Sequence, residues 1–147
     1  MPGLTDGAAS FATLLLSAEP GELRTRRAPG VWSAIEYACH VRDTLLVQRE
    51  RVLTALRIPQ PTFEPMGREE RVVHDGYAEQ APTDVARQIG DAALMFTNVL
   101  DRLDPAQWQR TLVHRGAITT VRSMRWVAAH SLHEVQHHLQ DAERQLA

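Results

Sequence analysis

The sequence predicts an all-α, antiparallel four-helix bundle that forms a single domain over residues 1–147. Apolar residues recur at helical spacing in four segments, and stretches containing proline or glycine separate these segments. Little of the chain is typical of β-strands. A chain of this length has the usual size of a single domain and is long enough to bury a hydrophobic core. Packing four amphipathic helices together buries their apolar faces in the most economical way.

The first predicted helix covers residues 4–18. Its apolar residues lie at helical spacing: Leu4, Ala8, Phe11, Ala12 and Leu15. Thr5 or Asp6 can cap its start, and the sequence Glu19-Pro20-Gly21 ends it. Residues 22–30 are rich in arginine and end in a Pro-Gly pair, so we expect a polar loop there.

The second predicted helix begins after Ser33. This serine and Glu36, three residues later, form the S-x-x-E capping box, and the helix runs through Leu56 and stops before Pro59. The three prolines in 59–65 exclude regular helix, and residues 67–80 predict only a short helix or turn. The second helix is thus followed by a long crossover of roughly 25 residues, which is more than a simple connection needs.

The third predicted helix starts at the Pro82-Thr83-Asp84 signal and ends before Pro105. Residues 104–119 are predicted to be irregular, with a small hairpin possible between 110–113 and 118–121. The last helix is expected from about Thr120 almost to the C-terminus.

Composition narrows the classes of partner. The formal net charge is −2, with 16 basic and 18 acidic residues, so nothing favours nucleic acid. Cys39 is the only cysteine and excludes an intrachain disulfide, as is usual in a reducing compartment. The longest early apolar run, 11–16, is too short for a membrane span and does not resemble a signal peptide. We expect a cytoplasmic protein with a small-molecule substrate and neither a nucleic-acid nor a membrane partner.

Histidines indicate a metal site. Four of the seven fall in residues 130–138, on the last predicted helix. His133 and His137 are an i, i+4 pair that shares one helix face, and His40 lies on the second helix. Three neutral imidazoles with one open position are typical of catalytic zinc sites, and nickel or ferrous iron would also accept them. The alternative is that these histidines form only a polar face.

Other polar residues can support such a site. His130, one turn before the pair, is a candidate proton carrier, spare ligand or cleft-lining residue. Glu36 and Asp43 share the helix face of His40, where a carboxylate could orient the imidazole. His138 is expected at the core edge or the surface, and we assign no role to the two remaining histidines, which lie in predicted loops.

Residues 133–137 also match the H-E-x-x-H motif of zinc proteases, in which Glu134 would be the general base. The extended form of the motif fails, because Gln140 stands where glycine belongs and Glu143 where histidine belongs. Glu143 remains open as a third ligand on the same helix. The motif therefore leaves a protease as a minor alternative.

A run of the form W-S-x-x-E-x-x-x-H-x-x-D is followed near the C-terminus by H-x-x-x-H. The first run comprises Trp32, Ser33, Glu36, His40 and Asp43. Together, in this order and separation, the two motifs resemble the DinB-like (YfiT-like) superfamily, and the resemblance covers nearly the whole chain. It implies an up-down-down-up bundle, often a homodimer, and a divalent metal on three histidines that map onto His40, His133 and His137.

The same resemblance implies a chemistry. Several relatives are transferases or isomerases that depend on a low-molecular-weight thiol such as mycothiol, bacillithiol or glutathione. The metal, zinc by expectation, would favour the thiolate, which is the attacking form. The lysine-free, arginine-rich composition suits an actinobacterium-like source, in which mycothiol would be the thiol. The alternative is a non-catalytic, stress-associated dimeric bundle that binds metal.

The sequence departs from the family pattern at one place. Many members show a His-His pair followed by Gly-Gln, with the second histidine as ligand, whereas here His137-His138 is followed by Leu139-Gln140. In that register His138 would be the ligand and Glu134 would stand at i−4. We prefer the pair His133 and His137, and both registers remain open at this point.

Overall fold

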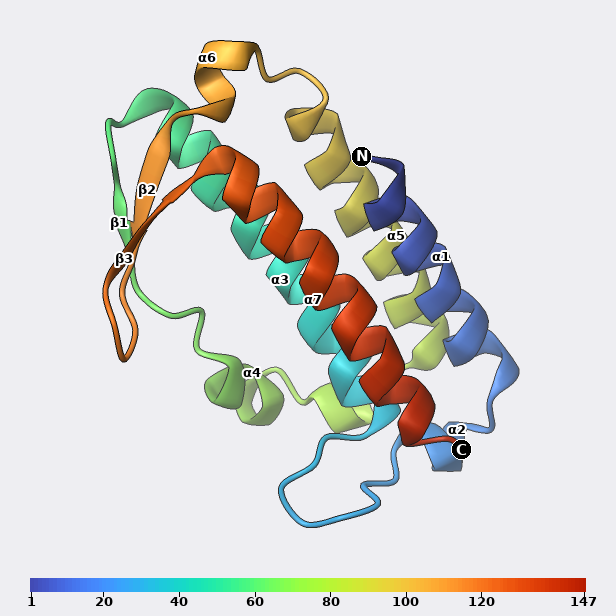
Figure 1. Ribbon diagram of the computed structural model, residues 1–147. Helices are drawn as coiled ribbons and strands as arrows, with labels where there is room; N and C mark the ends of the chain where they lie inside the picture. Colours follow the sequence, from blue (N-terminus) through green and yellow to red (C-terminus); the bar gives the residue numbers. More distant parts are fainter.

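The computed structural model describes all 147 residues and confirms the four-helix bundle. Its long helices are α1 (Pro2–Ser17), α3 (Ala34–Arg57), α5 (Pro82–Leu100) and α7 (Met124–Arg144). Helices α1 and α7 run in one direction and α3 and α5 in the other (Figure 1), which is the up-down-down-up order. Each of α1 and α3 packs against both α5 and α7.

Helix α1 begins earlier than predicted. Met1 is its N-cap and Pro2 is its first residue, where a missing backbone N–H costs nothing. Thr5 therefore lies inside the first turns and its hydroxyl donates a hydrogen bond to the Pro2 carbonyl. The predicted caps at Thr5 and Asp6 were wrong. The amine of Met1 donates to Asp101 just past the end of α5, which fixes α1 antiparallel to α5.

Helix α3 begins as predicted. The Ser33 hydroxyl oxygen accepts from the backbone N–H of Glu36 at 3.4 Å, and Glu36 Oε2 accepts from the backbone N–H of Ser33 at 2.8 Å. This reciprocal capping box satisfies two backbone donors that the helix itself leaves free. The helix ends at Arg57, shortly before Pro59.

The long crossover joins two parallel helices. Because α3 and α5 run the same way, the chain must return the length of the bundle between residues 58 and 81 (Figure 1). The return holds strand β1 (Thr62–Phe63), helix α4 (Arg68–His74) and the 3-10 turn η1 (Tyr77–Glu79). The topology explains why this connection is long.

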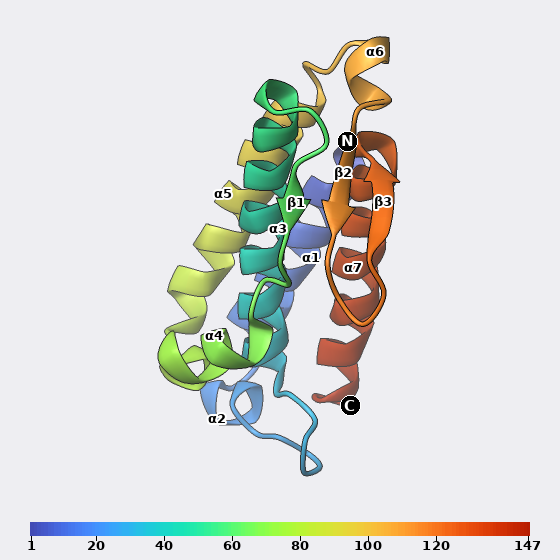
Figure 2. The ribbon, with the colours of Figure 1, turned by 90° about the vertical axis from the view of Figure 1, so that its left-hand side faces the viewer.

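A three-stranded sheet lies beside the bundle. Strands β2 (Thr111–His114) and β3 (Thr120–Ser123) form the antiparallel hairpin, and β1 pairs in parallel with β2. The sheet lies along α3 and α7 (Figure 2). The hairpin agrees with the prediction, but β3 occupies residues that the sequence predicts to be the start of the last helix. That helix starts later, at Met124, because the Ser123 side chain caps it by accepting from the backbone N–H of Trp126 at 3.1 Å.

Two short helices lie in segments predicted to be irregular. Helix α2 (Pro20–Leu23) follows α1, and α6 (Pro105–Trp108) follows α5. Each has proline at its first turn, and α6 also has a capping box made by Asp104 and Gln107. These local start signals explain both helices.

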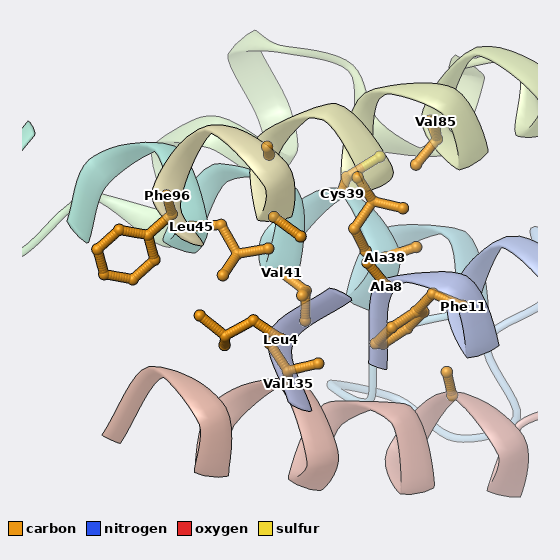
Figure 3. Packing of buried hydrophobic residues seen from close by; sticks show 14 of the residues in the cluster. Leu4, Ala8, Phe11, Ala38, Cys39, Val41, Leu45, Val85, Phe96 and Val135 are labelled. Atoms are coloured by element: carbon orange, nitrogen blue, oxygen red, sulfur yellow. The ribbon is translucent and has the colours of Figure 1, made fainter. Parts of the chain in front are cut away.

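Apolar side chains from the four long helices fill the space between them (Figure 3). The buried residues labelled there are Leu4, Ala8, Phe11, Ala38, Cys39, Val41, Leu45, Val85, Phe96 and Val135. Gly7 of α1 lies so close to α7 that an added Cβ would overlap the Val135 side chain. No helix has both the length and the apolar character needed to cross a membrane.

Candidate metal centre

His40 of α3 and His138 of α7 converge between these two antiparallel helices. Their ring centroids lie 4.9 Å apart at an interplanar angle of 83°, and both residues are buried. Glu134 lies one helical turn before His138. One ligand atom from each of the three residues falls within 4.8 Å of the others, so the three can hold one metal ion.

Two carboxylates flank the ring of His138. Its Nε2 lies 3.0 Å from Glu134 Oε2, and its Nδ1 lies 3.1 Å from Asp141 Oδ2. The hydrogen bond with His138 is the main cause that lowers the pKa of Glu134 to about 2, so this carboxylate is ionised at neutral pH. Asp141 is placed to fix the orientation of the imidazole, as carboxylates behind metal-binding histidines do.

His40 has an unused nitrogen. Its Nδ1 is buried without a hydrogen-bond partner, and its Nε2 lies 3.4 Å from the Thr44 hydroxyl. Burial lowers the pKa of His40 to about 4, which keeps the ring neutral and its lone pair available at neutral pH. Two imidazoles and an ionised carboxylate are a donor set that divalent zinc accepts with one position open. The residues therefore fit a divalent cation.

The predicted combination of His40, His133 and His137 is not brought together. His133 and His137 are exposed on the outer face of α7, and their rings stack at a centroid distance of 5.7 Å. His137 does lie within ligand distance of His138 and Asp141, but that second group comes from a single helix, and the His137 side chain is 51% exposed. The structure instead assembles the alternative register, with His138 opposite His40.

Glu36 and Asp43 do not orient His40. Glu36 pairs with Arg26 at 2.6 Å and completes the helix cap. Asp43 accepts from Arg42 at 2.8 Å and from the hydroxyl of Tyr77, which ties the crossover to α3. Both carboxylates are thus engaged elsewhere, and the expectation that one of them receives a proton from His40 was wrong.

Two cavities border the candidate centre. The first, of about 200 Å³, is lined by His40 and Glu134 and extends towards the sheet. The second, of about 190 Å³, is lined by His138 together with Trp32 and Tyr37. Arg68, the first residue of α4, borders both. A metal at this centre would be accessible to ligands from two sides.

His130 lines the first cavity. Its ring stacks on Trp126 with centroids 4.5 Å apart, and its Nε2 lies 3.6 Å from Glu134 Oε1. Burial is the main cause that lowers the pKa of His130, so the neutral ring can accept a proton. His114 of β2 also lines this cavity, although the sequence placed it in a loop and gave it no role.

The zinc-protease interpretation of the H-E-x-x-H motif does not match the arrangement of these side chains. Glu134 faces His138 and lies within ligand distance of His40, so it belongs with the donor atoms instead of acting as a separate base. Glu143, the third ligand left open by that reading, is exposed and lies outside both candidate groups.

The fold is similar to a solved structure, that of YfiT from Bacillus subtilis. The two chains share 15% sequence identity with a TM-score of 0.87, and the match covers 98% of this chain and 82% of the other. That protein is described as a probable metal-dependent hydrolase with an unusual four-helix bundle topology. No curated protein sequence matches the chain.

A family model independently matches the sequence. The model is that of the DinB superfamily, and it matches residues 4–142, which include all four long helices except their outermost residues and the whole candidate metal centre. The chain belongs to the DinB superfamily.

Proposed function

We propose that this protein is a divalent-metal-dependent enzyme whose metal is held by His40, Glu134 and His138. The observation that carries the proposal is that these side chains converge from two helices beside two cavities. A purely structural site would be closed by a fourth protein ligand. Only three protein donors converge at this centre, which leaves one coordination position of the metal open to a small molecule.

We further propose that the nucleophile is the sulfur of a low-molecular-weight thiol, such as mycothiol, and that the reaction is a transfer or isomerisation. A bound zinc ion would favour the thiolate over the thiol. The two cavities support a reaction with two substrates, because His138 borders one cavity and His40 and Glu134 border the other. The thiol and its electrophile could then approach from separate sides.

His130 is the proposed proton carrier. It lines the cavity shared with Glu134, and its lowered pKa leaves it neutral and able to accept the thiol proton near pH 7. Stacking on Trp126 and the 3.6 Å approach of its Nε2 to Glu134 Oε1 hold the ring in place. His130 would thus take part in the reaction as a proton acceptor and not as a metal ligand.

Hydrolysis is the second candidate. Two histidines and a glutamate are also the protein ligands of zinc hydrolases that activate water. The similar fold of YfiT, described as a probable metal-dependent hydrolase, supports this alternative. In that case one substrate and a water molecule would suffice. A homodimer and a cytoplasmic location remain predictions.

The experiment uses the zinc-loaded protein with a fluorogenic electrophile and, in turn, mycothiol, bacillithiol or glutathione. We expect thiol-dependent conjugation by the wild type and by His137→Ala, whose changed side chain lies on the exposed face. Activity should be lost in His138→Ala and after chelation. His130→Gln should keep its zinc but lose roughly a hundredfold in rate, the usual contribution of a positioned proton acceptor.

A parallel assay with an activated ester and no thiol separates the candidates. Ester cleavage that requires zinc and His138, without any thiol dependence, would replace the transferase proposal with hydrolysis. Zinc binding with no turnover in either assay would contradict both and favour the non-catalytic metal-binding bundle.

A further inference from the structure

The cavity of about 200 Å³ beside the candidate centre has an excess of basic groups. Arg51, Arg68, His114 and His130 border it, whereas Glu134 is its only carboxylate. Glu134 is a proposed metal ligand, so a divalent cation would more than neutralise its charge. With zinc in place, no negative charge in the cavity would balance the arginines.

Arg51 of α3 carries a charge without a counter-ion. Its Nη2 donates to the Glu64 carbonyl at 2.8 Å and its Nη1 to Gln48 Oε1 at 3.5 Å, and both acceptors are uncharged. By contrast, Arg42 on the same helix pairs with Asp43 at 2.8 Å. Burial is the main cause that lowers the pKa of Arg51. Arg51 is half-buried, and an anion is the partner that best satisfies a partly buried guanidinium, so Arg51 is available to one that the chain does not supply.

His114 offers a second unused group in the same cavity. Its Nε2 is buried and has no hydrogen-bond partner. Burial lowers the pKa of His114 to about 4, and the nearby basic groups Arg51, His130 and Arg122 lower it further. The ring is thus neutral, and with its proton on Nε2 it can donate to an oxygen of a ligand. A ligand would satisfy an atom that is costly to bury unpaired.

We propose that Arg51 and His114 form a carboxylate-binding subsite, so that the substrate of the metal centre is a small molecule carrying a carboxylate. A guanidinium presents parallel N–H donors that match the two oxygens of a carboxylate. The cavity connects this subsite to His40 and Glu134, so the carboxylate would be held at one end while the reacting group lies at the metal. This inference rests on the proposed function for the reaction, but the subsite can be tested without it.

The test is a titration of the zinc-free protein with succinate, followed by NMR signals of the His114 ring and the Trp126 indole. Succinamide, which has a similar shape without charge, is the matched probe. Arg51→Gln is compared with Arg87→Gln, which removes the same charge from an exposed pair with Asp84 on α5. We expect succinate to bind the wild type and Arg87→Gln equally. Arg51→Gln and the succinamide probe should each lose roughly ten- to a hundredfold in affinity, the effect of one charge-assisted contact.

Two results would overturn the subsite. One is an unchanged succinate affinity in Arg51→Gln. The other is binding only in the presence of zinc with no effect of Arg51→Gln, which would mean that the metal alone attracts the anion. Zinc affinity is measured on the same samples. Succinate binding that depends on Arg51 in a protein that fails to bind zinc would support the subsite and contradict the proposed metal function, so the two failures are distinguishable.

Discussion

The rings of His40 and His138 meet edge to face with centroids 4.9 Å apart, although the two residues lie far apart in the sequence. The antiparallel arrangement of α3 and α7 brings the first third of one helix against the last third of the other (Figure 1). The first cavity lies along the same two helices, with residues of α3 and α7 on its walls. The fold thus creates one place where a metal and a small substrate can meet.

Asp141→Asn should weaken zinc binding by roughly ten- to a hundredfold, the usual effect of removing a carboxylate behind a ligating histidine. The reason is that Asp141 Oδ2 lies 3.1 Å from the Nδ1 of His138 and holds the ring with Nε2 towards Glu134. Competition with a chromophoric chelator measures the affinity. Glu143→Gln, an exposed change on the same helix, is the control and should leave the affinity unaltered. Equal losses in both variants would contradict the role of Asp141.

The free energy of unfolding of the metal-free protein should fall as the pH is lowered from about 6.5 towards 4. His40 and His114 both have a pKa near 4 in the folded protein, mainly because of burial, against 6.5 for an exposed imidazole. In this window the unfolded chain binds protons that the folded chain does not, so stability is lost on acidification. Glu134, with its pKa lowered from 4.5 to about 2, adds a further loss below pH 4.5.

Urea denaturation at several pH values measures this profile. His114→Gln should flatten it between pH 6.5 and 4, whereas His74→Gln, an exposed change in α4, is the matched control. If His114→Gln left the pH dependence of the free energy of unfolding unchanged, the His114 imidazole would not be shielded from water as the structure indicates.

Replacement by alanine should have opposite effects on stability at two glycines. Gly7→Ala should destabilise the protein by about 1–3 kcal/mol, because the new Cβ would overlap the Val135 side chain where α1 packs on α7. Gly90→Ala should stabilise it by up to about 1 kcal/mol, since Gly90 lies within α5 with open space around it and alanine is the better helix former. Thermal unfolding of both variants checks the contrast, and a loss of stability in both would contradict the packing.

Local signals in the sequence were enough for much of the fold. The capping box of Ser33 and Glu36 gave the start of α3 correctly, because both partners lie within one helical turn. Strand β1 has only two residues and exists because Pro61, Phe63 and their neighbours pair with β2 across the crossover. Such pairing depends on the tertiary fold and leaves no periodic pattern in the chain.

The candidate site was harder to predict than the fold. One face of α7 is buried in the structure, namely Met124, Ala128, Ser131, Val135 and Ala142. His138 lies on this same face, three residues after Val135 and four before Ala142. Helical spacing alone therefore predicts that His138 belongs to the buried face. What the sequence alone could not decide is whether the metal-binding face of α7 coincides with its exposed row of histidines or with the buried face opposite α3.

The zinc content of purified His138→Ala and His137→Ala, measured beside the wild type, tests the central claim most directly. With His40, Glu134 and His138 as ligands, one zinc per chain should remain in the wild type and in His137→Ala and be lost from His138→Ala. Circular dichroism confirms that each variant is folded. Zinc retained by a folded His138→Ala and lost from His137→Ala would contradict the assignment and move the metal to the exposed face of α7.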